Sequence, residues 1–376
     1  MIKTYKVELA PNNKQRSLLY QAAGTARWAY NWALANEKAH YAECGKFLFD
    51  GELRKRLTQL KKTEFSWLHR YSDNVTKQAI KDCTIALKHF FKGNAQFPTF
   101  KSKHRTKPSF YHDPWKLKVA ETHVQLEKIG RIRLKERSRI PLGESYQNPR
   151  ITCDNGRWYI SVAVDVECTE ATETAPPIGI DLGVKDLAVI SDGRVFKNIN
   201  KRRLLKRLER RKKRLQRRAS RHYERMVKSR CKKSRGLLNL EKQIRSVNQK
   251  IRDQRTNHIH QMTAKLVKTK PEFIVIEDLN VDGMLKNHRL ARVVQDNRFA
   301  EVRRQLEYKC EWYGVRLIVA DRFYPSSRLC SECGHKKPDL KLSDRVYRCS
   351  ECGNVMDRDR NAAINLMQYG MREVSA

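Results

Sequence analysis

The chain has 376 residues, which is long enough to bury a substantial core and to form two or three domains. Its formal net charge is +38, and because self-repulsion of that size strains a compact state, we expect a polyanionic partner, most simply nucleic acid. A basic membrane-surface protein is the alternative. We find no amphipathic anchor, lipidation signal, secretory signal or apolar run near the roughly 18 residues of a transmembrane helix, so we expect a cytoplasmic protein.

The N-terminal part of the chain is predicted to be mainly helical. The expected elements are a strand at residues 3–10 and helices at Gln15–Ala23, Thr25–Tyr41, Leu53–Lys62 and Val75–Phe91. We expect a hinge between the first two helices at Gly24. These two helices favour a helix-turn-helix only weakly, because Trp28 and Trp32 are more typical of a core than of a surface that stacks on bases.

The pattern changes at Gly93, where short alternating segments begin. A cation-rich stretch, Phe97–Arg105, is interrupted by a proline, and predicted strands follow at 123–128, 130–135, 148–154 and 157–166. Several short strands separated by turn residues indicate a small barrel or sandwich. The acidic, Thr-rich segment Val166–Pro177 ends in two prolines and is predicted to be a linker.

From Ile178 the pattern is α/β. The predicted order begins with two strands, IGIDLG and LAVIS, followed by the hairpin turn Asp192–Gly193 and a third strand, RVFKN. A long basic helical stretch at Lys201–Lys268 comes next, and then a buried strand FIVIEDL, a helix at Asn297–Glu311, a buried strand VRLIVADR and a last helix at Asn361–Tyr369. The basic stretch should break at Lys232–Gly236 into two antiparallel helices, one with a coiled-coil seam at Leu240, Ile244, Val247 and Ile251. This order is close to that of a ribonuclease-H-like fold.

Two acids follow apolar strands in this region. Asp181 ends the run Ile178–Ile180, and Glu277 ends Ile274–Ile276. Because ligand sites of α/β sheets lie beyond the carboxyl ends of the strands, we expect the two acids to meet there. Either acid alone is more often a turn or capping residue. Repulsion between them would be relieved by hard divalent cations, so together they predict two Mg²⁺ or Mn²⁺ ions of a metal-dependent nuclease.

The third acid of such a site is one of two candidates near the C-terminus. Asp357 is better placed to cap the last helix, whereas Asp359 lies nearer the NAA sequence of that helix, so we favour Asp359. Asp186 and Asp278 are nearby acids without a predicted role. Asp278 should point to the opposite face from Glu277 if the strand continues.

Four of the ten cysteines have the spacing C-x2-C-x15-C-x2-C, which is typical of a structural zinc site. The four are Cys330, Cys333, Cys349 and Cys352. Four thiolates close the coordination sphere, so we expect the zinc to be structural and not catalytic. The other cysteines are scattered singly, which indicates reduced thiols.

Clusters of cations predict contacts to nucleic-acid phosphates. Lys201–Arg218 holds twelve cations and one acid, Glu209; a solvated helical face is the alternative, but this density favours phosphate contact. The candidate residues are Lys77, Lys81, Lys101, Lys103, Arg105, Lys206, Arg207, Arg210, Arg211 and Arg214.

These motifs resemble the transposon-encoded TnpB family, which is related to the type V CRISPR effectors. GIDLGVKDLAVIS, IVIEDLNVDGM and CSECG…CSECGNVMDRDRNAAINL are similar to the three RuvC segments and the zinc ribbon of that family; ELAPNNKQ, ARWAYNWAL and FPTFKSK are similar to its N-terminal half. The resemblance covers nearly the whole chain. It implies an RNA-guided DNA endonuclease that binds a guide RNA from the transposon end, recognises a short target-adjacent motif and cuts both strands of DNA in one RuvC site.

The resemblance also implies the domain organisation and the site residues. It assigns a wedge-like β-barrel to 1–10 and 93–172, a helical recognition insert to 11–92, a RuvC-like nuclease domain to 173–325 and 356–376, and a zinc ribbon to 326–355. It assigns catalysis to Asp181, Glu277 and Asp359 and zinc binding to the four cysteines. The expected location is the nucleoid of a prokaryotic cytoplasm, with no obligate protein partner. Asn74–Phe91 and Phe97–Arg105 are the candidates for reading the motif.

Two other functions are compatible with the sequence. One is an RNA-guided repressor that binds DNA without cutting it, although such a protein need not keep the three acids. The other is a resolvase or transposase that uses a RuvC-like site without a guide.

Overall fold

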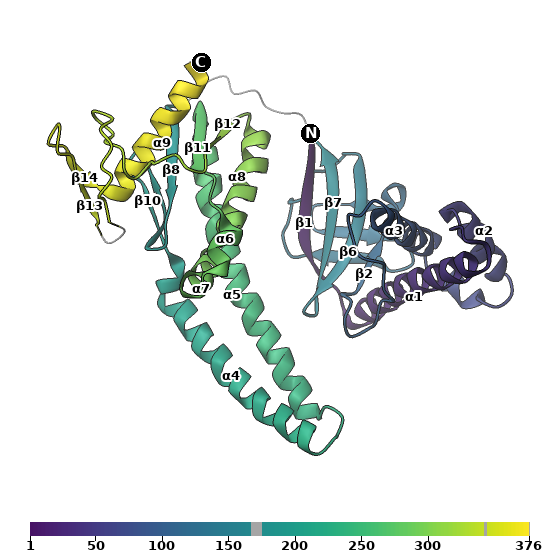
Figure 1. Ribbon diagram of the computed structural model, residues 1–376. Helices are drawn as coiled ribbons and strands as arrows, with labels where there is room; N and C mark the ends of the chain where they lie inside the picture. The colour runs from purple at the N-terminus through teal and green to yellow at the C-terminus, as the bar shows by residue number, and fades with distance from the viewer. Residues whose placement is uncertain (167–174, 342–343, 376) are drawn as a thin grey trace. The chain divides into compact units, whose positions relative to one another are not determined.

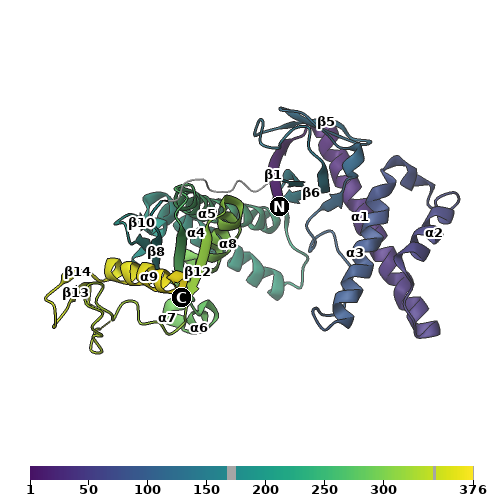
Figure 2. The same ribbon diagram turned by 90° about the horizontal axis from the view of Figure 1, so that it is seen from above.

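The computed structural model describes residues 1–166, 175–341 and 344–375, so most of the predicted linker at 166–177 lies outside the described residues. The chain forms two compact units, Met1–Glu167 and Cys168–Ala376. Figures 1 and 2 show the elements of each unit from two directions. No described helix combines the length and the apolarity needed to cross a bilayer.

The first unit contains a seven-stranded antiparallel sheet. Its strands are β1 (Ile2–Ala10), β2 (Ser109–Tyr111), β3 (Lys118–Val119), β4 (His123–Leu126), β5 (Gly130–Leu134), β6 (Tyr146–Asp154) and β7 (Arg157–Asp165), in the order β2-β6-β7-β1-β5-β4-β3. β7 alternates buried and less buried residues, as the sequence predicted. The predicted barrel is not closed by strand pairing in the described part of the chain, because no such pairing joins the edge strands β2 and β3. Both edges are short, and Pro108 and Pro114, which lack a backbone donor, flank β2.

Three helices complete the first unit: α1 (Asn13–Cys44), α2 (Asp50–Leu60) and α3 (Asp73–Phe91). Figure 2 shows α1 beside α3. The predicted hinge at Gly24 is wrong, because α1 runs through it. Buried residues lie on both sides of Gly24, with Leu19 before it and Leu34 after it, and their packing outweighs the roughly 1 kcal/mol by which glycine disfavours a helix. Trp28 and Trp32 pack against the core of this unit, as expected.

The second unit contains a five-stranded mixed sheet. Its strands are β8 (Ile178–Leu182), β9 (Asp186–Ile190), β10 (Val195–Lys197), β11 (Phe273–Glu277) and β12 (Arg316–Ala320), in the order β10-β9-β8-β11-β12. β8, β11 and β12 are parallel, whereas β9 and β10 form an antiparallel hairpin with β8. These strands and the turn at Asp192–Gly193 confirm the predicted α/β order.

The helices of the second unit are α4 (Arg203–Lys228), α5 (Arg235–Val267), α6 (Val281–Lys286), α7 (His288–Asn297), α8 (Phe299–Tyr313) and α9 (Arg358–Ser375). The predicted break between α4 and α5 is confirmed, and Ser234 caps α5 through the backbone amide of Leu237. The predicted seam is also confirmed, because its four residues pack in one cluster with leucines of α4. α6 and α7 were not predicted, and the expected helix start at Asn297 is wrong. Arg298 has a φ of 58°, which separates α7 from α8.

The cysteine region contains one small hairpin, β13 (Val346–Arg348) paired with β14 (Val355–Asp357). It precedes α9 directly. With the bounds Arg358–Ser375, α9 is longer at both ends than the predicted helix Asn361–Tyr369.

Candidate active site and four-cysteine centre

The first two predicted acids lie at the ends of neighbouring parallel strands. β8 and β11 pair in the register Ile178–Ile274, Gly179–Val275 and Ile180–Ile276. Asp181 and Glu277 are each the next residue of their strand. The register therefore places both carboxylates at one edge of the sheet, where the sequence predicted them.

The third acid is brought in by α9, which packs on β8 (Figure 1). A Cβ atom on Gly179 would lie 2.1 Å from the carbonyl oxygen of Ala363 and 2.6 Å from the backbone nitrogen of Met367. Gly179 shares a strand face with Asp181, and Ala363 lies one helical turn after Asp359. The absence of a side chain at Gly179 thus lets the helix approach closely enough to bring Asp359 to Asp181.

Replacing Gly179 with alanine should destabilise the protein by about 1–3 kcal/mol, because the new methyl group overlaps the backbone of α9. Urea-induced unfolding measures this change. Gly236→Ala in α5 is the matched control, since its Cβ would meet nothing closer than 3.8 Å. If both variants unfold at the same urea concentration, the close approach of α9 is not required.

The three acids line a common cavity of about 860 Å³. Its other charged lining residues are Lys185, Lys201, Asp296, Arg328, Lys341, Arg345 and Arg358. Asp357 is not among the lining residues: its Oδ1 accepts hydrogen bonds from the backbone amides of Asp359 at 3.0 Å and Arg360 at 3.1 Å. It therefore caps α9, as the sequence predicted.

The two remaining acids near the site are held by cations. Asp278 pairs with Arg303 and Arg322, each at 2.6 Å. Asp186 pairs with Lys197 at 3.3 Å. Neither carboxylate lines the cavity, which agrees with the prediction that they have no role in it.

The electrostatics of the cavity favour a bound cation. Burial raises the pKa of Asp181 well above its usual value, and the negative charges of Glu277 and Asp359 raise it further. Burial also raises the pKa of Glu277, against a hydrogen bond from Ser326 that lowers it. Asp359 is paired with Arg358 at 2.8 Å. The donors are all carboxylate oxygens, a set that fits Mg²⁺ or Mn²⁺.

The four cysteines predicted to bind zinc lie together. Their sulfur atoms are all within 4.8 Å of one another, with Cys330 and Cys352 at 3.6 Å and Cys333 and Cys349 at 3.5 Å. A tetrahedral zinc with Zn–S bonds of about 2.3 Å holds its sulfurs about 3.8 Å apart, so the cluster is compatible with zinc. Burial raises the pKa of Cys330, but hydrogen bonds from the backbone of Cys333 and Glu332 lower it to about 6. The thiolate form that a metal requires is thus favoured at Cys330. At Cys333 and Cys352, hydrogen bonds from the backbone are outweighed by those among the sulfurs, which raise the pKa of Cys333 and raise the pKa of Cys352 to about 12.

The local sequence explains how each cysteine pair turns. Both pairs lie in the sequence CSECG, and the closing glycines Gly334 and Gly353 have φ values of +73° and +71°, which are strained for other residues. The backbone amide of Cys330 donates to His335, and that of Cys349 donates to Asn354, each at 2.9 Å. The repeated motif therefore forms two similar turns that face each other.

The predicted nucleic-acid contacts are spread over both units. On α4, Lys206, Arg207, Arg210, Arg211 and Arg214 are exposed, while Leu205 and Leu215 pack toward α5. In the first unit, Lys77, Lys81, Lys103 and Arg105 are exposed. Lys101 is only partly exposed, and its Nζ lies 3.4 Å from the centre of the Tyr30 ring.

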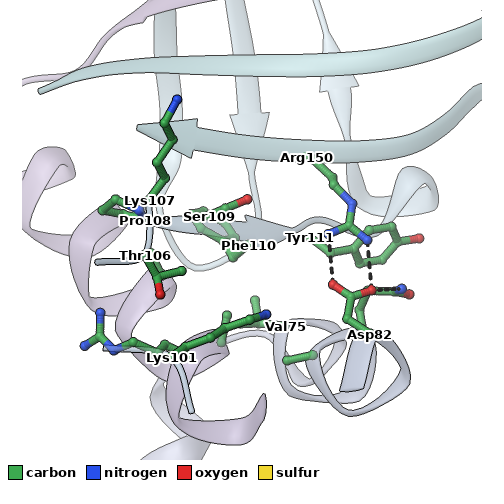
Figure 3. Close-up of a pocket in the computed structure, with 15 residues that line it drawn as sticks. Val75, Asp82, Lys101, Thr106, Lys107, Pro108, Ser109, Phe110, Tyr111 and Arg150 are labelled. Atoms are coloured by element: carbon green, nitrogen blue, oxygen red, sulfur yellow. Dashed lines mark hydrogen bonds and ion pairs between the residues drawn. The ribbon is translucent and has the colours of Figure 1, made fainter. Parts of the chain in front are cut away.

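Lys101 lies in a cavity of about 90 Å³ that is bounded by α1, α3, β2, β6 and the chain before β2 (Figure 3). On the opposite side, Arg150 forms two hydrogen bonds to Asp82, at 2.9 and 3.0 Å. Both segments that the sequence proposed for motif reading contribute residues to this cavity. The sequence did not single out Arg150 as a residue of this cavity, because Arg150 belongs to a strand and no local cluster of cations marks it.

Three family profiles match the chain. Residues 159–288 match a family described as "Probable transposase", residues 299–366 a "Cas12f1-like, TNB domain", and residues 1–46 a "Helix-turn-helix domain". In the structure, the last of these ranges holds β1 and the single helix α1. A helix-turn-helix, which the sequence favoured only weakly, is therefore absent from 1–46.

Relatives of known description align with nearly the whole chain. A protein of Streptomyces pristinaespiralis, named as an RNA-guided DNA endonuclease with a provisional qualifier, is 31% identical over 98% of this chain and 89% of its own length. The chain belongs to the TnpB family. A second TnpB-family relative, InsQ of Escherichia coli, carries the same provisional description and is 29% identical over 98% of this chain and 92% of its own length.

A solved complex of Cas12f1 with guide RNA and target DNA aligns with 98% of this TnpB-family chain and 99% of that protein, at 16% identity and a TM-score of 0.37. The assignment to the TnpB family therefore rests on the sequence relatives.

Proposed function

We propose that this TnpB-family chain is an RNA-guided DNA endonuclease with one RuvC-like active site, formed by Asp181, Glu277 and Asp359. The observation that carries the proposal is the meeting of three acids, from segments nearly 180 residues apart, in one cavity that is also lined by cations. Buried carboxylates that repel one another are unfavourable unless a cation compensates them.

The three acids fit a pair of Mg²⁺ or Mn²⁺ ions. Their ligand atoms do not all lie within 4.8 Å of one another, since among the described residues only the four cysteines and the group His40, Glu43 and Cys44 meet that limit. We propose two ions because two-metal nucleases place a pair about 3.5–4 Å apart on a shared set of carboxylates. When bound, the ions polarise the scissile phosphate and lower the pKa of the attacking water.

The residues of the chain would hold and orient the reacting groups. Asp181, Glu277 and Asp359 would hold the ions, and the arginines and lysines of the cavity would contact the phosphates on either side of the scissile bond. The water oxygen bonds to phosphorus, the bond from phosphorus to the 3′ oxygen breaks, and the 3′ oxygen takes up a proton. The products are a 5′-phosphate and a 3′-hydroxyl.

Target choice would come from the guide RNA. Base pairing between guide and target strand would read the sequence, while the protein would bind backbone and shape and recognise a short target-adjacent motif. We place that recognition in the first unit, which carries the helical insert and the sheet proposed as the wedge. The four cysteines would hold a structural zinc.

The direct test is to purify the protein with its bound RNA, sequence that RNA, and incubate the complex with Mg²⁺ and a plasmid that matches the guide. We expect cuts in both strands next to the matched sequence. Intact plasmid that is nevertheless bound would instead support a guided repressor. RNA-free protein that cuts as well as the complex would support an unguided resolvase or transposase.

The exposed cations of α4 should give a salt-dependent affinity. Changing Arg210 and Arg211 to glutamine should reduce the slope of log affinity against log salt for duplex DNA by about 0.9 for each phosphate that the protein no longer neutralises. Fluorescence anisotropy over a salt series measures the slope. Lys265→Gln with Lys268→Gln, two exposed cations at the end of α5 and outside the proposed recognition insert, removes the same charge as a control. Equal slopes for the two double variants would show that α4 makes no specific contact to phosphate.

A further inference from the structure

Three amide side chains on one face of α9 hold a neighbouring loop. Asn361, Asn365 and Gln368, which we call the amide ladder, are spaced four and three residues apart. Asn361 donates to the carbonyl of Leu329 at 2.6 Å and accepts from the backbone amide of Ser331 at 3.0 Å. Asn365 donates to the carbonyls of Ser326 at 2.7 Å and Leu329 at 2.8 Å, and Gln368 donates to that of Ser331 at 2.7 Å.

The ladder contacts backbone that forms little regular structure of its own. Residues 326–331 contribute a turn and one isolated bridge, between Leu329 and Lys336. Asn361 and Asn365 are 0% and 2% exposed, so their amides would be costly if they were not hydrogen-bonded. The buried amides therefore fix the path of this loop against α9.

The loop links both chemical centres of the second unit. At its start, the hydroxyl of Ser326 donates to Oε1 of Glu277 at 2.5 Å, and Ser326 is 4% exposed. Near its end, Cys330, the first cysteine of the four-cysteine centre, lies between the two residues that Asn361 contacts. The same helix carries Asp359. One helix thus holds one acid directly and reaches a second acid through Ser326.

We propose that Ser326 is a positioning residue for Glu277, and that the amide ladder couples this contact to the four-cysteine centre. The proposal rests on the proposed function, in which Glu277 binds a metal ion. The hydroxyl fixes one carboxylate oxygen of Glu277, and the other oxygen remains available to the ion. Partners of metal ligands that act in this way usually contribute 10- to 100-fold to metal affinity or activity.

The experiment measures Mn²⁺ affinity of the zinc-loaded, full-length protein by electron paramagnetic resonance. Ser326→Ala and Asn365→Leu should each weaken Mn²⁺ binding about 10- to 100-fold, and the double variant should be no weaker than the worse single variant. Ser326→Thr, which keeps the hydroxyl, should restore wild-type affinity. A second readout, the melting temperature, should be nearly unchanged by Ser326→Ala.

A buried amide outside the ladder gives the matched control. Gln305 of α8 is 0% exposed and hydrogen-bonds to Thr263 and Glu301, away from the cavity. Gln305→Leu should lower the melting temperature and leave Mn²⁺ affinity within about twofold of wild type.

The outcomes separate the inference from the proposed function. If the wild-type protein binds no Mn²⁺ at a site that is lost when Asp181 is replaced, the proposed function itself is overturned. An Asp181-dependent site that Ser326→Ala leaves unchanged would overturn only the positioning role. Fully additive effects in the double variant would overturn the coupling through the ladder.

Discussion

Replacing Asp181 with asparagine should reduce guided DNA cleavage by about a thousandfold or more while leaving the guide RNA bound. Asparagine has nearly the same shape, but it lacks the negative charge that would hold a divalent ion at the end of β8. Cleavage is measured on a supercoiled plasmid with Mg²⁺, and RNA binding on a native gel. Residual cutting of both strands would show that Asp181 is not a catalytic acid.

The pair Asp357 and Asp359 supplies an internal control. Asp359→Asn should abolish cleavage like Asp181→Asn, because Asp359 lines the cavity. Asp357→Asn should leave cleavage within a few fold, since asparagine caps a helix about as well as aspartate. The reverse pattern would move the third metal ligand to Asp357.

Without Mg²⁺, Asp181→Asn should make the folded protein more stable, although the same substitution abolishes cleavage. The pKa of Asp181 is higher in the folded protein than in the unfolded chain. At a pH below the unfolded pKa, its contribution to the free energy of unfolding is therefore fully present, and this contribution is lost as the pH rises through the folded pKa. At neutral pH, Asp181→Asn should therefore be more stable than the wild type in zinc-loaded, Mg²⁺-free buffer. Thermal unfolding at pH 5 and pH 8 tests this, and the difference should be larger at pH 8.

Removing zinc should unfold the region around the four cysteines and disturb the active site. Structural zinc sites bind with apparent free energies of about 10–16 kcal/mol, which small domains depend on to fold. In the chelated protein or in Cys330→Ser, backbone amides of 326–331 and 344–357 should exchange with deuterium much faster. Hydrogen exchange followed by mass spectrometry locates the change, and a zinc-binding dye measures the metal released.

Cys231 provides the matched control for the cysteine substitution. It is exposed after α4 and distant in sequence from the four-cysteine centre. Cys231→Ser should keep the zinc and the exchange pattern of the wild type. Unchanged exchange in Cys330→Ser would show that the cysteines do not stabilise this region.

Elements with strong local signals could be predicted from the sequence. The apolar runs before Asp181 and Glu277 became β8 and β11, and the Leu240–Ile251 seam packs as expected. The hinge at Gly24 was wrong, and the predicted barrel is not closed by strand pairing among the described residues, because both features depend on packing between distant segments. Alanines on either side of Gly24 continue α1 across it, and short edge strands leave the sheet of the first unit without a closing pair among the described residues.

The side chains that hydrogen-bond to the acids could not be predicted either, because such pairs also depend on how separate segments pack. Ser326 lies 49 residues from Glu277 in the chain, and no local pattern links them. Arg358 adjoins Asp359 in sequence, but adjacency alone does not show that their side chains pair. The Ser326–Glu277 hydrogen bond depends on the path of the loop at 326–331, which contacts α9 through the amide ladder.

Residue type and spacing were enough to single out the four cysteines, the three acids and the strong positive charge, because metal-ligand motifs and charge can be recognised within short segments of the chain. How the acids meet could not be read from any one segment. Gly179 permits α9 to lie directly on β8, and that contact brings Asp359 to Asp181 and places the amide ladder beside the cysteine loop. Such contacts arise from close packing of segments far apart in the chain, which no local pattern encodes.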